Sequence, residues 1–340
     1  MAKKAPLLLF LVPAGLAGAS ACSSGADPRP DVSDAVEAEG SDGTDGGCEP
    51  GDEPLDLLGT WAARAWVDVY MVTPGGGIVH LCPDPRVYGV SLITLRVRVY
   101  EQTGTAVRHV FNVCRLQMPL VEAAIDPLCA STVGMQLAIG RPLTQQWPDI
   151  DYPGGAVLGG TGTCSTYVAD PLVAVFGTDE TIGATETLPT WRSGCESDPP
   201  TCVDGWEHVV DSDGDGHPGV TLTVTSEPGD LIVGEAYTAY RTVDLLRGVA
   251  RSSSLILGEV EPEMDYQIID SDVLVGGGPL PPQLVRDNIP IFEIPRAGST
   301  FVLLRADGRY GADDLDADGS GEVTCDEILA AESIFAPYQP

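Results

Sequence analysis

The segment ITLRVRVY, residues 93–100, decides the fold class of this chain. Apolar side chains (Ile, Leu, Val and Val) occupy its odd-numbered positions, and Thr, Arg and Arg lie between them. A period of two places one face of an extended strand against a core and the other in solvent, which is typical of antiparallel sheets. Residues 220–225, VTLTVT, alternate in the same way, so the pattern predicts half-buried antiparallel strands in two distant parts of the chain.

Further runs of β-rich composition continue this pattern from Trp61 to Arg305. They cover residues 61–72, 107–116, 167–176, 236–246, 255–260, 267–275 and 301–305. Gly- and Pro-rich stretches such as TPGGG and VGGGPLPP separate them, as turns do. Helical periodicity is confined to Val121–Ala130 and the C-terminus. We therefore predict an all-β domain over residues 55–310, an antiparallel barrel in preference to a sandwich.

The N-terminus has the pattern of an export signal. A pair of lysines is followed by an uncharged segment up to Ala21, which prolines interrupt and which is short for a membrane span. The sequence ASAC, ending at Cys22, resembles a bacterial lipobox, in which the cysteine is lipidated after cleavage, although Ala19 stands where Leu is usual. We therefore expect a signal peptide over residues 1–21 and a membrane anchor through a lipid on Cys22, with plain secretion as the alternative.

Residues 22–54 are rich in acids, Gly, Ser and Pro and show no periodicity, so we expect a disordered acidic tether. Ser23 follows the candidate lipid site, which resembles lipoproteins sorted to the outer membrane. The expected location is therefore extracytoplasmic, at the outer membrane or the cell surface.

The cysteine count agrees with export. Of nine cysteines, one is the candidate lipid site at Cys22, which leaves an even set. The others are Cys48, Cys82, Cys114, Cys129, Cys164, Cys195, Cys202 and Cys325. An even set in an exported chain predicts disulfides, although spacing does not give their pairing. Cys195–Cys202 is the favoured local pair because CESDPPTC reads as a Pro-rich turn.

Residues 316–327, DADGSGEVTCDE, resemble an EF-hand or dockerin-type calcium loop at every position. Ca²⁺ takes six to eight oxygens at about 2.3–2.6 Å, and alternate positions of a tight turn aim oxygens at one point. The expected ligands are the side chains of Asp316, Asp318 and Ser320, the Glu322 carbonyl, Thr324 through a water, and Glu327 as the bidentate ligand. A strand and a turn precede the loop, so we expect no entering helix, and we expect an exiting helix within residues 311–340.

Residues 211–217, DSDGDGH, resemble the DxDxDG loops of secreted calcium-binding repeats. Asp211, Asp213 and Asp215 supply side chains and His217 its backbone carbonyl, but Leu222 stands where the closing carboxylate would be. Asp204 and Glu207 are the nearest upstream acids that could replace it. This loop is therefore predicted to be the lesser of two calcium sites, and a hairpin turn solubilised by aspartates is the alternative.

Gly59-x-Trp61 at the start of the domain resembles the G-x-W motif on the first strand of lipocalin-like (calycin) barrels. In that family the Trp closes one end of the barrel, and an Arg near the last strand packs across it. Arg305 is the matching residue here. The resemblance implies a barrel that carries a small apolar ligand, in a cavity lined by alternate strand residues.

The net charge of −32, from 50 acidic and 18 basic residues, disfavours binding to nucleic acid and suits binding of cations. The four histidines stand apart and give no zinc pattern, and no nucleophile elbow, P-loop or dinucleotide fingerprint occurs. We therefore expect a non-enzymatic, calcium-binding, disulfide-stabilised envelope protein with a structural or surface-binding role, its protein partner undefined. A calycin-like carrier is the alternative, and a secreted hydrolase is less favoured.

Overall fold

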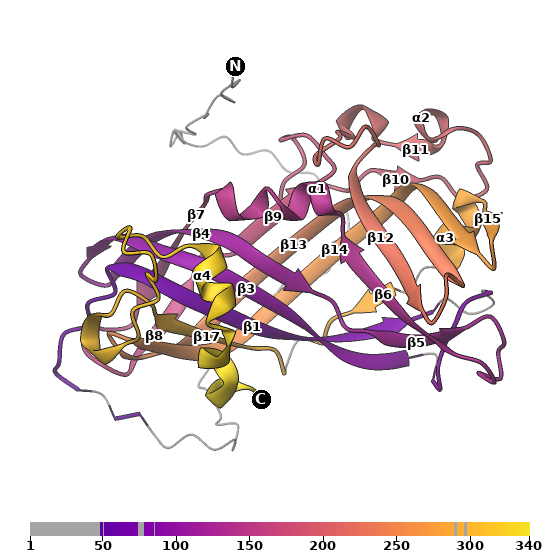
Figure 1. Ribbon diagram of the computed structural model, residues 1–340. Coiled ribbons are helices and arrows are strands. Elements are labelled where there is room, and N and C mark those ends of the chain that lie inside the picture. Colours follow the sequence, from indigo (N-terminus) through magenta and orange to yellow (C-terminus); the bar gives the residue numbers. More distant parts are fainter. Residues whose placement is uncertain (1–47, 50, 74–77, 85, 289–290, 296–297) are drawn as a thin grey trace, which may run out of the picture. The chain divides into compact units, whose positions relative to one another are not determined.

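The computed structural model describes residues 48–49, 51–73, 78–84, 86–288, 291–295 and 298–340. The predicted signal peptide, the candidate lipid site Cys22 and most of the predicted tether lie outside these residues. The described residues form one compact unit (Figure 1). No helix in the described part of the chain is long and apolar enough to cross a membrane.

The unit is built from strands, as the sequence predicts. They are β1 (Gly59–Val72), β2 (His80–Leu81), β3 (Arg86–Thr103), β4 (Ala106–Gln117), β5 (Val121–Ala124), β6 (Val133–Ile139), β7 (Tyr152–Leu158), β8 (Ser165–Ala169), β9 (Leu172–Phe176), β10 (Thr190–Trp191), β11 (Val203–Asp204), β12 (Val220–Glu227), β13 (Ile232–Ser252), β14 (Leu255–Val275), β15 (Gly278–Leu280), β16 (Ile291–Glu293) and β17 (Thr300–Arg305). All except β10 and β11 belong to one large antiparallel sheet.

The helices are short. They are α1 (Arg141–Thr144), α2 (Pro199–Cys202), α3 (Pro282–Asn288) and α4 (Cys325–Ala330), with 3₁₀ turns η1 (Trp147–Asp149), η2 (Trp206–His208), η3 (Arg309–Gly311) and η4 (Glu332–Tyr338). The predicted helix over Val121–Ala130 is wrong. Its first part is β5, which pairs with β2 and β6 and buries Val121 and Ala123, and the Cys82–Cys129 disulfide holds the turn after it.

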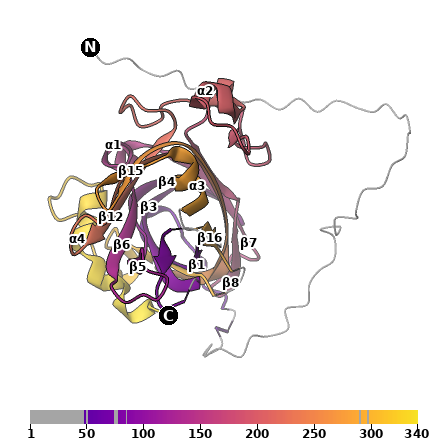
Figure 2. The ribbon, with the colours of Figure 1, turned by 90° about the vertical axis from the view of Figure 1, so that its right-hand side faces the viewer.

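Eight strands are hydrogen-bonded in a closed ring, in the order β1, β3, β4, β7, β8, β13, β14 and β17 (Figure 2). The ring falls short of a regular barrel because several of its pairings are short: β7 pairs with β8 only over Ala156–Leu158, and β14 pairs with β17 only over Leu255–Glu259. Beyond this contact the long strands β13 and β14 continue into a second part of the sheet, with β12, β6, β5 and β2. The prediction of an all-β fold is therefore confirmed.

Two apolar cores fill this sheet. One lies inside the ring and includes Trp61, Phe111 and Ile256, and the other lies at the far ends of the long strands and includes Met71 and Met135. Trp61 is fully buried, and Arg305, its partner across the β1–β17 pair, is 2% exposed. The two residues are therefore buried side by side, with the Arg305 guanidinium over the Trp61 ring.

The C-terminal segment packs on the outside of the ring. Val323, Ile328 and Phe335 are buried against Trp66 and Val302, and α4 contacts β3 and β4. A disulfide joins Cys114 on β4 to Cys325 at the start of α4, and the other disulfides are Cys48–Cys164, Cys82–Cys129 and Cys195–Cys202. The last of these is the local pair that the Pro-rich turn predicts. Four disulfides are typical of a protein outside the cytoplasm.

Candidate functional site

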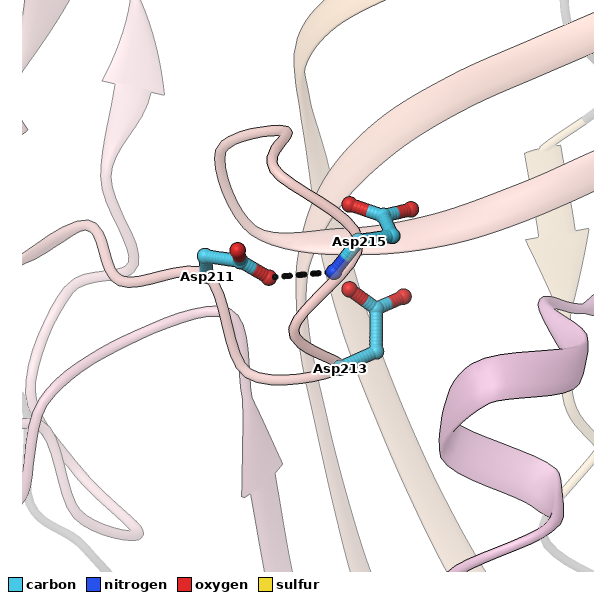
Figure 3. A group of neighbouring side chains, drawn as sticks. All are labelled: Asp211, Asp213 and Asp215. Carbon is cyan, nitrogen blue, oxygen red and sulfur yellow. Dashed lines mark hydrogen bonds between the residues drawn. The ribbon is translucent and has the colours of Figure 1, made fainter.

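The loop that precedes β12 gathers three carboxylates. Side-chain oxygens of Asp211, Asp213 and Asp215 all lie within 4.8 Å of one another (Figure 3). A bridge between Asp211 and Gly219 brings the two ends of the loop together. Because Ca²⁺–oxygen bonds are about 2.3–2.6 Å long, oxygens at this separation could share one ion.

Backbone N–H groups hold the first aspartate of this loop. The Asp211 carboxylate accepts hydrogen bonds from Gly214 at 2.6 Å, Gly216 at 3.0 Å and Asp215 at 3.3 Å. Gly214 and Gly216 have φ angles of 75° and 95°, which a side chain would strain. Burial acts to raise the pKa of Asp211, but the N–H groups of the two glycines outweigh it, and its pKa is lowered. Asp211 is therefore held as an anion.

The second aspartate differs because it is buried. Asp213 is 4% exposed, and its Oδ2 accepts the Thr221 N–H at 3.0 Å, while its Oδ1 has no hydrogen-bond partner. Burial raises the pKa of Asp213, and the negative charges of Asp215 and Asp211 add to this effect. A buried oxygen without a partner is unfavourable, and a cation shared with the other two carboxylates would remove the penalty.

The remaining predicted ligands of this loop have other contacts. Asp215 accepts hydrogen bonds from the His217 N–H at 2.8 Å and from the Thr221 hydroxyl. The His217 ring stacks on Tyr237, with ring centroids 4.2 Å apart. Asp204 pairs with Arg192 at 3.2 Å, and it is not part of the three-aspartate cluster. Glu207 likewise lies outside the cluster, with its carboxylate 4.0 Å from His208.

The C-terminal loop gathers a second group of acids. Oxygens of Asp316, Asp318 and Glu327 lie within 4.8 Å of one another. The Asp316 carboxylate accepts the N–H groups of Ser320 at 3.0 Å and Gly321 at 2.7 Å. The structure therefore brings together the first, third and twelfth positions of the predicted calcium loop.

Glu327 also forms a capping box with Thr324 at the start of α4. One oxygen of its carboxylate accepts the Thr324 N–H at 2.8 Å and hydroxyl at 2.9 Å, and the other accepts the Ala317 N–H at 2.8 Å. The hydrogen bonds from Thr324 lower the pKa of Glu327. The Ser320 hydroxyl donates to the Glu322 carbonyl at 3.1 Å, so these two predicted ligands are neighbours in the loop. As predicted, a strand and the turn η3 precede the loop in place of an entering helix.

Burial distinguishes the two loops. In the C-terminal loop Asp318 is exposed, and Asp316 and Glu327 are half-buried. The loop at Asp211–Asp215 contains a buried carboxylate oxygen without a partner, which the C-terminal loop lacks among the described residues. The structure therefore favours the loop that the sequence ranks second.

A cavity of about 140 Å³ lies between the two cores of the sheet. Alternate residues of β1, β3, β9 and β13 line it, which is the lining that the carrier hypothesis predicts. The lining is mostly apolar, but it includes Asp244 on β13, which the sequence analysis missed. The sequence did contain a signal for this residue. Asp244 is an even number of positions from Tyr240 and Leu246, so in an extended strand the three side chains lie on the same face.

A comparison of the chain with protein-family models, with curated proteins and with solved structures finds no match.

Proposed function

We propose that this protein is an exported calcium-binding protein of the cell envelope, with a structural or surface-binding role and no catalytic one. The observation that carries this proposal is the buried Oδ1 of Asp213, which lies without a partner beside two further carboxylates. The lipid on Cys22 would anchor the protein to a membrane. The four disulfides support the extracytoplasmic location, where calcium is plentiful enough to fill sites with dissociation constants of about 0.1–1 mM.

The chemistry of the donors favours calcium over other ions. The clustered side chains in both loops are all Asp or Glu, whereas structural zinc sites are built from cysteine and histidine. Mg²⁺ demands near-ideal octahedral geometry, which glycine-rich loops with ligands of mixed burial suit poorly. Calcium bound only to the folded state would raise its stability by mass action.

Thermal unfolding of the purified protein tests this proposal, measured with excess EGTA, with 5 mM Ca²⁺ and with 5 mM Mg²⁺. Calcium at about ten times a dissociation constant of 0.5 mM stabilises the folded state by about 1.4 kcal/mol, which raises the midpoint by a few degrees. We expect Asp213→Asn to remove most of this shift and Glu327→Gln to remove a smaller part. Glu207→Gln, an exposed acid near the first loop, is the matched control and should keep the full shift. An unchanged midpoint for the wild-type protein on addition of Ca²⁺ would sink the proposal.

The cavity favours a second candidate function, the carriage of a small apolar ligand. Its lining includes Ile93, Phe111, Leu172 and Val260, which are apolar residues from four strands. Cavities of about 150 Å³ lined by such residues can bind benzene-sized molecules. Binding of ethylbenzene to the purified protein, measured by ligand-observed NMR, tests this function separately from calcium binding.

A further inference from the structure

Asp244 points into the cavity because of its position in β13. Tyr240, Thr242, Asp244 and Leu246 alternate along the strand, and all four line the cavity. The arginines on the other face of the strand form ion pairs elsewhere. Arg241 pairs with Asp265 at 3.1 Å and Arg247 with Glu261 at 3.4 Å. The alternation of the strand therefore separates the Asp244 carboxylate from these cations.

The structure gives this carboxylate no hydrogen-bond or ion-pair partner among the described residues. Asp244 lines the cavity, and burial raises its pKa to about 7. The other titratable groups of the lining are Tyr152, Tyr240 and Glu263, and the lining contains no Lys, Arg or His. The charge that the lining can carry is therefore negative.

Aromatic rings supply much of the remaining lining. They belong to Phe111, Trp147, Tyr152, Phe176, Tyr240 and Phe292. Phe111 stacks on Tyr152 with centroids 5.1 Å apart, and Phe176 stacks on Tyr240 with centroids 6.3 Å apart. The faces of aromatic rings attract cations, and the attraction is strongest where water is excluded. A positive group in this cavity would meet both a carboxylate and several π-systems.

We propose that the cavity binds a small organic ammonium ion, a protonated amine on an apolar body, with Asp244 as its counter-ion. The inference rests on the second candidate function, since it names the class of ligand that the cavity would carry. A volume of about 140 Å³ limits the apolar body to roughly the size of one benzene ring. An ammonium ion would satisfy the carboxylate by a charge-assisted hydrogen bond, which a hydrocarbon ligand leaves unmade.

Benzylammonium and ethylbenzene form a matched pair of probes, because they differ only in an ammonium group against a methyl group. Each is titrated by ligand-observed NMR into the purified full-length protein at pH 8, where Asp244 is ionised and the amine is protonated. We expect benzylammonium to bind the wild-type protein about tenfold or more tightly than ethylbenzene. Asp244→Asn should abolish this preference.

Two controls complete the experiment. Glu261→Gln removes an outward-facing carboxylate from the neighbouring strand, so it should keep the preference for benzylammonium. Lowering the pH to 5.5 protonates Asp244 in the wild-type protein and should weaken benzylammonium binding. This test needs no substitution, so it decides the question even if Asp244→Asn does not fold.

The outcomes separate the inference from the function on which it rests. Equal binding of the two probes would overturn the role of Asp244 and leave the carrier function intact. Failure of both probes to bind would overturn both. A preference for benzylammonium that persists in Asp244→Asn or at pH 5.5 would place the ammonium site elsewhere and also overturn the inference.

Discussion

The guanidinium of Arg305 lies across the indole of Trp61, with 5.2 Å between its central carbon and the ring centroid. Its nitrogens donate to the backbone carbonyls of Asp56, Ser253 and Leu58 and to the carboxylate of Asp307. The Trp61 indole N–H in turn donates to the Leu57 carbonyl at 2.9 Å. One buried cation therefore ties together the segment before β1, the β13–β14 turn and the end of β17.

Removal of this guanidinium should strongly destabilise the fold. Arg305→Ala leaves several buried carbonyls and a carboxylate without donors, so we expect a loss of about 3–5 kcal/mol in the free energy of unfolding. Urea unfolding with the disulfides intact measures it. Arg247→Ala, which removes an exposed cation from a surface ion pair, is the control and should change stability by less than about 1 kcal/mol. A similar small effect for Arg305→Ala would contradict the central role of this residue.

Asp213→Asn should have opposite effects with and without calcium. The variant keeps an oxygen to accept the Thr221 N–H but removes a buried charge that Asp211 and Asp215 repel. In EGTA we therefore expect the variant to be at least as stable as the wild-type protein, and in Ca²⁺ less stable. Calorimetric unfolding midpoints under the two conditions make the comparison. A variant that is less stable by the same amount in both would indicate a purely structural aspartate.

The stability of the protein should fall as the pH rises toward 7 because of Asp244. Its carboxyl has an ordinary pKa of 3.8 in the unfolded chain, and burial raises its pKa to about 7 in the folded state. Between these values the folded state binds more protons than the unfolded state, so stability present at low pH is lost with rising pH. The full difference is about 4 kcal/mol.

Asp244→Asn stays neutral at every pH and isolates this contribution. We expect the variant to match the wild-type protein near pH 4 and to exceed its stability at pH 8 by up to about 4 kcal/mol. Denaturant unfolding across this range gives the two curves. Tyr152 and Tyr240, which face the same cavity, have pKa values raised by burial and titrate above this window. Glu263→Gln, an exposed acid of the same lining, serves as the control, and parallel curves for wild type and Asp244→Asn would refute the assignment.

The disulfides should differ in their effects on stability. Cys114–Cys325 spans 211 residues and holds the C-terminal segment against β4, whereas Cys195–Cys202 spans seven. Loop-closure entropy predicts a loss of about 5 kcal/mol when the first pair is replaced by alanines and about 2 kcal/mol for the second. Chemical unfolding of the two double variants tests the order. A larger loss for the short loop would show that local packing outweighs chain entropy here.

The sequence alone predicts strands and metal-binding loops because period-two alternation and motif spacing are local properties. The even number of cysteines left after Cys22 likewise needs no structure, because it is a matter of composition. Alternation in residues 93–100 specifies a half-buried strand wherever that strand lies, and β3 includes all of them. The spacing of Asp316, Asp318 and Glu327 likewise predicts that their carboxylates meet in one loop. The prediction of a helix over Val121–Ala130 was wrong because the apolar spacing of this segment suits a helix, whereas pairing with β2 and β6 makes its first part a strand.

The tertiary structure decided which distant residues meet. The ring closes through β13 and β14, and no local pattern specifies that β17 pairs with only the first residues of β14. The same packing buries one oxygen of Asp213, which makes the loop that the sequence ranks second the better candidate for calcium. Alternation along β13 determined which face of the strand carries Asp244, but only closure of the sheet made that face part of a cavity wall. Burial depends on contacts between segments far apart in the chain, and local sequence patterns contain no direct record of them.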